Sequence, residues 1–165
     1  MSIIYQKLTA VYAQAYRNLR LESIKAHPES FCAVYEEQAQ LPKLMFEAAI
    51  ENPVNSRFMM GAFDGDVLIG ICGFVPLAQA DDAGELIQVY VRAAYGGRKI
   101  GLGLVKTAVC QAFTIPYIHR VLLDVKRGNL NAIRVYEQAG FEPNTVTPTL
   151  VGEHLCMSIS RDTHA

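Results

Sequence analysis

Apolar residues recur along the chain with two different periods, one typical of strands and one typical of helices. Runs rich in β-branched, aromatic and aliphatic residues predict strands at 3–8, 57–63, 67–75, 85–92, 118–125 and 155–159. Asp64-Gly65, between the second and third of these runs, is a typical two-residue hairpin signal.

Helical spacing appears in four segments. Tyr12, Tyr16 and Leu19 predict a first helix, capped by Thr9 and ending near His27-Pro28. Residues 28–40 are expected to be irregular, and a second helix is expected from Pro42 to just before Asn52-Pro53. A third helix is expected from Ile100 to before Pro116, and a fourth between an Asn129 cap and Gly140.

The resulting order is β-α-α-β-β-β-α-β-α-β-β, with a polar connection at 76–83 and a further extended run from Phe141. Such an order favours an α/β fold, a mixed sheet with helices on both faces. At 165 residues, the chain is expected to form a single domain over 1–165.

A glycine-rich turn joins the strand at 89–91 to the helix that begins at Ile100. Gly96, Gly97, Arg98 and Lys99 form this turn, and Gly101 and Leu102 open the helix. The first amide groups of a helix have no partner within it, and the positive end of the helix dipole lies behind them. With two basic residues beside them, they suit a phosphate. An ordinary structural turn is the competing interpretation.

Two better-known phosphate motifs fit this turn poorly. A Walker loop needs Gly-Lys-Ser or Gly-Lys-Thr at the helix start, where this chain has Gly101-Leu102-Gly103. Asp124, about 20 residues on, fits the dinucleotide fingerprint, but Lys106 occupies the position of that fingerprint's third glycine. Eight residues, 92–99, also separate the strand from the helix, whereas that fingerprint follows its strand almost at once.

Composition excludes several classes of protein. A hydrophobic fraction of 51% and a net charge of −1 describe an ordinary globular protein, without the basic surplus of a nucleic-acid or membrane-surface binder. No signal peptide or membrane span is expected, so we expect a cytoplasmic protein. Cysteines 32, 72, 110 and 156 lack metal-site spacing; we expect buried free thiols and no metal site.

Two stretches resemble a known family. Residues 129–141, NLNAIRVYEQAGF, contain every letter of the pattern N-x-x-A-x-x-x-Y-E-x-x-G-F found in the GNAT superfamily of N-acetyltransferases. Residues 89–103 resemble that superfamily's coenzyme-binding motif, a valine-rich strand followed by Q/R-x-x-G-x-G/A. Gly96 stands where the family prefers Arg or Gln, and Lys99 where it prefers Gly. We expect these departures to weaken or reshape coenzyme binding without abolishing it.

The resemblance implies a GNAT-type, largely antiparallel twisted sheet whose central strands, here 89–91 and 118–125, splay apart. It implies transfer of an acetyl group from acetyl-coenzyme A to an amine by direct attack, without an acyl-enzyme. Pantetheine would bind the strand backbone, and the diphosphate would bind 96–102. The predicted coenzyme contacts are Val89, Tyr90, Val91, Gly96, Gly97, Arg98, Lys99, Ile100, Gly101, Leu102, Asn129, Ala132 and Tyr136.

Two residues are the leading catalytic candidates. Tyr136, with an ordinary pKa of about 10, can donate a proton to the departing thiolate; packing of its helix is the alternative role. Glu85 is the first candidate for the base, although an exposed strand carboxylate is equally consistent. Glu36, Glu37, Tyr90 and His154 remain further candidates for the base. A strand amide near 89–91 can hold the oxyanion, and Asn129 serves as a cap, with or without a coenzyme contact.

The amine acceptor is the least defined part. In this family the first two helices and the following loop line the acceptor side, here about 12–51. Tyr16, Phe31, Tyr35, Glu36 and Glu37 form either a cation-binding mouth or ordinary core and surface. A small-molecule or peptide amine is the expected acceptor, and the sequence leaves open whether the protein forms a homodimer. The alternative function is a non-catalytic coenzyme A-binding module of the same fold.

Overall fold

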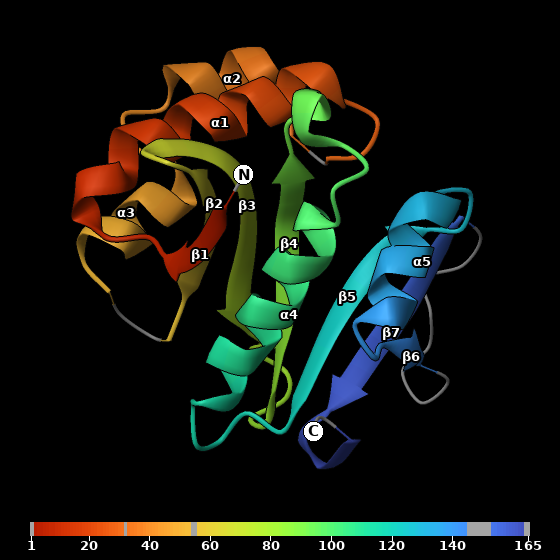
Figure 1. Cartoon of the computed structure of the whole chain (residues 1–165). Coiled ribbons are helices and arrows are strands. Elements are labelled where there is room, and N and C mark those ends of the chain that lie inside the picture. Colours follow the sequence, from red (N-terminus) through yellow and green to blue (C-terminus); the bar gives the residue numbers. More distant parts are fainter. Residues whose placement is uncertain (1, 32, 54–55, 145–152, 164–165) are drawn as a thin grey trace.

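A twisted sheet of seven strands forms the centre of the computed structural model, which describes residues 2–31, 33–53, 56–144 and 153–163. The spatial order is β1-β2-β3-β4-β5-β7-β6, and every neighbouring pair is antiparallel except β4 and β5 (Figure 1). The strands are β1 (Ile3–Lys7), β2 (Phe58–Asp64), β3 (Val67–Pro76), β4 (Ala83–Val91), β5 (Arg120–Lys126), β6 (Glu142–Pro143) and β7 (His154–Ser160).

Helices cover both faces of this sheet, as the element order predicts. One core contains residues of α4 (Ile100–Phe113) and α5 (Leu130–Gln138), and a second contains residues of α1 (Ala13–Ala26) and α3 (Met45–Glu51). The remaining helix, α2 (Tyr35–Gln40), lies beside α1 (Figure 1). Three short 3₁₀ turns, η1 (Ala10–Tyr12), η2 (Ala93–Tyr95) and η3 (Arg161–Thr163), complete the described elements.

The strands β2 and β3 explain why the chain is so hydrophobic. Phe58, Met60 and Ala62 of β2 point into the α4 core, whereas Met59 and Phe63 point into the α1 core. A strand that is buried on both faces reads as a continuous apolar run and not as an alternation. The predicted hairpin is present, with Gly65 (φ 60°) and Asp66 as its turn.

The central strands β4 and β5 pair over only a short length. The described residues of the two strands pair at three positions, namely Ala83 with Arg120, Gly84 with Val121 and Glu85 with Leu122. Beyond these residues the two strands diverge toward their carboxyl ends (Figure 1). The predicted GNAT-type sheet with splayed central strands is therefore confirmed. Among the described residues, no strand pairs with the β5-facing backbone edge of β4 after Glu85.

Three expectations about the first 52 residues are wrong. Residues 35–40 form α2, because a six-residue helix is too short to show a hydrophobic period and is favoured instead by Glu36 and Glu37 in its first turn. The next helix starts at Met45, not Pro42, where the Glu47 carboxylate accepts the Leu44 amide at 2.8 Å. Thr9 precedes η1 and makes no side-chain cap.

The burial of the cysteines also differs from expectation. Cys72 is buried, but Cys156 is half-buried and Cys110 is exposed, while Cys32 lies outside the described residues. Cys110 belongs to α4, on the side of that helix away from its buried residues. No disulfide joins the three described cysteines.

Other boundaries agree closely with the sequence. Gly140 has φ 103° just after α5, which is the left-handed conformation expected of a glycine that ends a helix. The run from Phe141 yields only β6, since residues 145–152 lie outside the described part of the chain. None of the helices in the described ranges combines the length and apolarity that crossing a membrane requires.

Candidate functional site

The helix α4 begins with amide groups that have no backbone acceptor in the part of the chain that the structure describes. The first backbone hydrogen bond of this helix runs from the Gly103 amide to the Lys99 carbonyl. Within the described residues, no backbone carbonyl accepts a bond from the amides of Gly97, Ile100, Gly101 or Leu102. These donors lie at the positive end of the α4 dipole, beside the exposed side chains of Arg98 and Lys99, which is an arrangement suited to an anion.

The backbone of this turn shows what each of the two departures from the family pattern costs. Lys99 is left-handed (φ 59°, ψ 24°), which is costly for a residue with a Cβ and natural for glycine. The family's glycine preference therefore falls on a position that requires this conformation. Gly96, in contrast, has an ordinary φ of −61°. Gly97 has φ 77°, and a Cβ there would meet nothing within 4 Å.

Polar contacts tie this turn and the end of β4 to the rest of the protein. The Tyr95 hydroxyl donates to Asp64 Oδ2 at 2.7 Å, on the β2–β3 hairpin. The Glu22 carboxylate of α1 accepts from the Tyr90 hydroxyl at 3.0 Å and from Arg92 Nε at 3.1 Å. These anchors fix the approach to α4 from both sides, and the sequence alone offered no signal that paired them.

A β-bulge interrupts β4 just where the strand leaves β5. Ile71 of β3 pairs with Tyr90 and Gly73 pairs with Ile87, so Cys72 faces both Gln88 and Val89. Gln88 is left-handed, with φ 58°. The extra residue shifts the pleat, which places Val89 and Val91 against the α4 core and Tyr90 in the α1 core. The three predicted contacts at 89–91 thus lie on the splayed part of β4.

Tyr136 projects from α5 into the α4 core at the level of this bulge. Its side chain is 8% exposed and makes an edge-on contact with Phe141, with ring centroids 6.1 Å apart. Burial raises the pKa of Tyr136, and the nearby Cys72 thiol adds to the rise. The raised pKa keeps the proton on the Tyr136 hydroxyl, and no group in the described ranges hydrogen-bonds that hydroxyl.

Asn129 has a clear structural role. Its Oδ1 accepts the amide of Ala132 at 3.2 Å and so caps α5. This contact brings the predicted pair Asn129 and Ala132 together at the helix start, near the carboxyl end of β5. A coenzyme contact by either residue stays a prediction.

Glu85 is the last residue at which β4 pairs with β5. It is half-buried, and its pKa is raised first by burial and then by the negative charge of Asp124. Asp124 lies 3.0 Å from Nδ1 of His154, so two of the candidate bases share one neighbour. A carboxylate with a raised pKa at the base of the splay has the property that a general base requires.

The other candidate bases occupy less suitable places. Glu36 and Glu37 are exposed in the first turn of α2. Burial raises the pKa of Tyr90, and the hydrogen bond that its hydroxyl donates to Glu22 raises it further.

The residues proposed for an acceptor mouth are divided by the fold. Tyr16 is fully buried in the α1 core. Phe31 and Tyr35 are half-buried under the cations of Arg20 and Lys25, at 4.7 and 5.5 Å from the ring centroids.

A cavity of about 780 Å³ lies instead between the loop after α1 and the loop after β5. It is lined by His27, Glu29, Ser30, Lys126, Arg127, Gly128, Asn129 and Glu153. Sequence reasoning missed it because its walls come from segments about 100 residues apart. Among the described residues, no group of three or more His, Cys, Asp and Glu side chains is placed to hold a metal ion.

Known structures with the same fold carry acetyltransferase names. One is the ribosomal-protein-S5-alanine acetyltransferase from Vibrio fischeri, with a TM-score of 0.76 and 15% identity over 100% of this chain and 96% of that one. Another is the spermidine N-acetyltransferase from Vibrio cholerae in complex with CoA and spermine, with a TM-score of 0.70 and 18% identity over 98% and 97%.

A third is the aminoglycoside acetyltransferase AAC(6')-Ib in complex with coenzyme A and kanamycin, with a TM-score of 0.70 and 20% identity over 98% and 96%. No curated protein sequence matches the chain. The model of the acetyltransferase (GNAT) family matches residues 12–141, which is well over half of the chain. The protein therefore belongs to the GNAT family of acetyltransferases and is an acyltransferase enzyme.

Proposed function

We propose that this protein is an N-acetyltransferase that moves an acetyl group from acetyl-coenzyme A to a primary amine by direct attack within a ternary complex. The observation that carries the proposal is the combination of open amide donors at the start of α4 with a β4 edge that has no strand partner after Glu85. The first suits a diphosphate and the second suits an extended amide chain, and coenzyme A contains both in sequence.

The residues present fit this coenzyme. The amides of Gly97, Ile100, Gly101 and Leu102 would hold the diphosphate, supported by the charges of Arg98 and Lys99. A Cβ built at Gly101 would meet only Val91 Cγ2, at 4.0 Å, so the helix start is open on that side. The backbone of Val89, Tyr90 and Val91 would bond the pantetheine arm as an added strand.

The acetyl donor supplies a thioester, and side chains and amides of the protein transfer protons and stabilise charge during its reaction. Glu85 takes a proton from the incoming ammonium, directly or through water. Burial and the negative charge of Asp124 raise the pKa of Glu85, which makes its carboxylate a stronger base than that of an ordinary glutamate. An amide of the splayed β4 segment would stabilise the negative charge that develops on the carbonyl oxygen.

Tyr136 is the proposed proton donor to the departing thiolate. Burial keeps its hydroxyl protonated, because an ionised phenolate is disfavoured in this apolar core. No described protein group hydrogen-bonds that hydroxyl, which leaves it available for a sulfur atom. Its position at the level of the β4 bulge, beside Cys72, supports this role.

The acceptor is proposed to be a small-molecule or peptide amine. Relatives of the same fold are named for aminoglycosides, spermidine and a ribosomal protein's alanine, so the fold admits both kinds of amine. Glu85 and Asp124 on the sheet supply negative charge that favours a cation.

Two assays test the proposal together. A thermal-shift titration with coenzyme A should raise the melting temperature in a concentration-dependent way, because a ligand that binds only the folded state stabilises it. A thiol-release assay with acetyl-coenzyme A across polyamines, aminoglycosides, amino acids and peptides should show turnover with at least one amine. Stabilisation without turnover for any of these amines would favour a coenzyme A-binding module instead.

A further inference from the structure

The bulge in β4 determines which side chains and which backbone groups face the splay. Without it, strand alternation would put Leu86, Gln88 and Tyr90 on one face. With it, Leu86, Val89 and Val91 share the α4 core. One extra residue therefore decides which side chains of the proposed coenzyme-binding segment face the α4 core.

The extra residue is held in a conformation that its type does not favour. Gln88 has φ 58°, a region that glycine adopts readily and that other residues adopt at a cost. Such a conformation persists only where surrounding contacts require it. The backbone at Gln88 therefore needs an external restraint.

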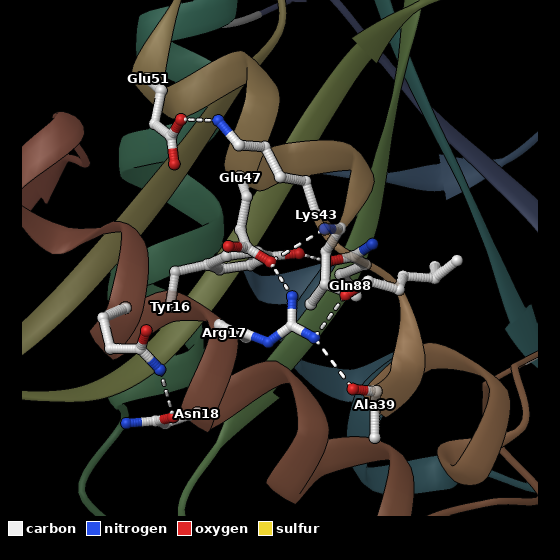
Figure 2. Close-up of polar contacts among 11 residues, drawn as sticks. Tyr16, Arg17, Asn18, Ala39, Lys43, Glu47, Glu51 and Gln88 are labelled. Carbon is white, nitrogen blue, oxygen red and sulfur yellow. Dashed lines mark hydrogen bonds and ion pairs between the residues drawn. The ribbon is translucent and has the colours of Figure 1, made fainter.

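A hydrogen bond from helix α1 reaches the Gln88 side chain. The Tyr16 hydroxyl donates to Gln88 Oε1 at 2.6 Å, across 72 positions of sequence (Figure 2). Tyr16 is 0% exposed, so its hydroxyl points from inside the α1 core to the strand and not to solvent. Gln88 is the single polar side chain in the run 86–91 apart from the Tyr90 hydroxyl, which bonds elsewhere.

A second set of contacts fixes the helix turn that carries Tyr16. Arg17 donates to Glu47 Oε1 at 2.5 Å and to the Ala39 and Leu41 carbonyls at 3.0 and 2.7 Å (Figure 2). The same Glu47 carboxylate caps α3. Arg17 thus joins α1, the end of α2 and the start of α3 into one support, from which Tyr16 reaches the bulge.

We propose that Tyr16 is a positioning residue for acetyl transfer, whose hydroxyl holds Gln88 left-handed and so keeps the bulge that aims the backbone of 89–91 at the bound thioester. The proposal rests on the proposed function. It adds a role for α1 that does not require α1 to touch the acceptor. Tyr16 itself remains a core residue.

The decisive test compares substitutions at position 88. Gln88→Gly and Gln88→Ala both remove the acceptor of the Tyr16 bond, but only glycine adopts the left-handed conformation without cost. We expect Gln88→Gly to keep kcat for thiol release within about threefold of the wild type, and Gln88→Ala to lower it about tenfold or more. Equal values for the two variants would overturn the proposal.

A double variant separates positioning from core packing. Tyr16→Phe should lower kcat about tenfold, and Tyr16→Phe combined with Gln88→Gly should return to within about threefold of Gln88→Gly alone. A role in packing alone predicts that the two losses multiply, which would contradict the proposal. Tyr117→Phe is the matched control, because it removes a hydroxyl bond to Ser56, outside the proposed site, and should leave turnover unchanged.

A readout without turnover keeps this inference distinct from the proposed function. In ¹⁵N-labelled protein, Tyr16→Phe and Gln88→Ala should displace the amide signals of Val89 and Val91, and Gln88→Gly should displace them less. If the wild type releases no thiol with any amine, the proposed function fails while these signals still decide the role of Tyr16. Unmoved signals in Tyr16→Phe would overturn that role.

Discussion

At the scale of single residues, the proposed site contains groups held in unfavourable states. Glu85 and Tyr136 each have a raised pKa because they are buried, and Lys99 and Gln88 each adopt a left-handed backbone. Perturbed titration and backbone strain both concentrate at functional sites. These four residues lie on the segments that frame the splay between β4 and β5.

The first residue-scale prediction concerns pH. Because only the carboxylate of Glu85 can accept a proton, kcat/KM should rise as the pH rises through its raised pKa. Asp124→Asn removes the negative neighbour, so the rise should move to lower pH, while burial still keeps it above that of an ordinary glutamate. A pH–rate profile measures both. A profile that Asp124→Asn leaves in place, together with full activity of Glu85→Gln, would exclude Glu85 as the base.

The raised pKa also has a consequence for stability. The stability that involves Glu85 is greatest below its unfolded-state pKa and is lost as the pH rises through its folded-state pKa. Glu85→Gln should therefore melt no lower than the wild type at neutral pH, which makes it a sound variant for the kinetic test.

The second residue-scale prediction concerns Tyr136. Tyr136→Phe removes the proposed proton donor, and general acid catalysis is worth about 10²–10⁴-fold, so we expect thiol release to slow by about 10²-fold or more. Coenzyme affinity should change by less than about twofold, since the phenyl ring keeps its packing in the core. Calorimetric titration with coenzyme A and steady-state kinetics separate the two effects. Equal turnover in both proteins would remove Tyr136 from its proposed role.

At the scale of elements, the sequence predicts best where a helix end has its own chemistry. The start of α4 at Ile100 and both ends of α5, at Asn129 and Gly140, follow from glycines and a capping side chain. Helix α2 and the start of α3 do not, because a short helix has no period and Glu47 acts three residues inside its helix. The bulge at Gln88 is hidden because a strand buried on both faces shows no alternation whose break would reveal it.

The parts of the candidate site that the sequence predicts are likewise those with a local motif. The α4 turn, Tyr136 and Asn129 are local motifs, so the sequence predicts where they lie. The contacts Tyr16–Gln88, Glu22–Tyr90 and Asp64–Tyr95 join residues 31 to 72 positions apart. Such pairs depend on tertiary packing, which a single sequence does not reveal.

The element-scale prediction concerns the start of α4. Gly101→Glu places bulk and a negative charge beside the open amides, so we expect the dissociation constant for coenzyme A to rise about tenfold or more. Gly101→Ala is the matched control, because its Cβ would touch only Val91 Cγ2 at 4.0 Å and it should bind within about twofold of the wild type. Calorimetric titration of both variants measures the difference. Wild-type affinity in Gly101→Glu would mean that the diphosphate binds elsewhere.

At the scale of the whole molecule, one short parallel pairing organises the enzyme. The sheet β1–β4 with α1–α3 and the strands β5–β7 with α5 meet through Ala83–Glu85 and Arg120–Leu122, and α4 packs across β1–β4 and against α5. Above this pairing the two strands splay apart, the β4 bulge lies on the splayed part, and Tyr136 lies near Cys72 at the level of that bulge. The proposed site thus lies where β4 and β5 are not paired, and Tyr16 of α1 contacts β4 from the face opposite α4.

The proposed function depends above all on amides at the start of α4 that bind the diphosphate of coenzyme A. Its most direct test is a titration of ¹⁵N-labelled protein with coenzyme A, with pantetheine, which lacks the diphosphate, as the comparison ligand. We predict saturable shifts at Gly97, Gly101 and Leu102 with coenzyme A that pantetheine does not produce. Coenzyme A binding that leaves the signals of these three amides unchanged would exclude the start of α4 as the diphosphate site.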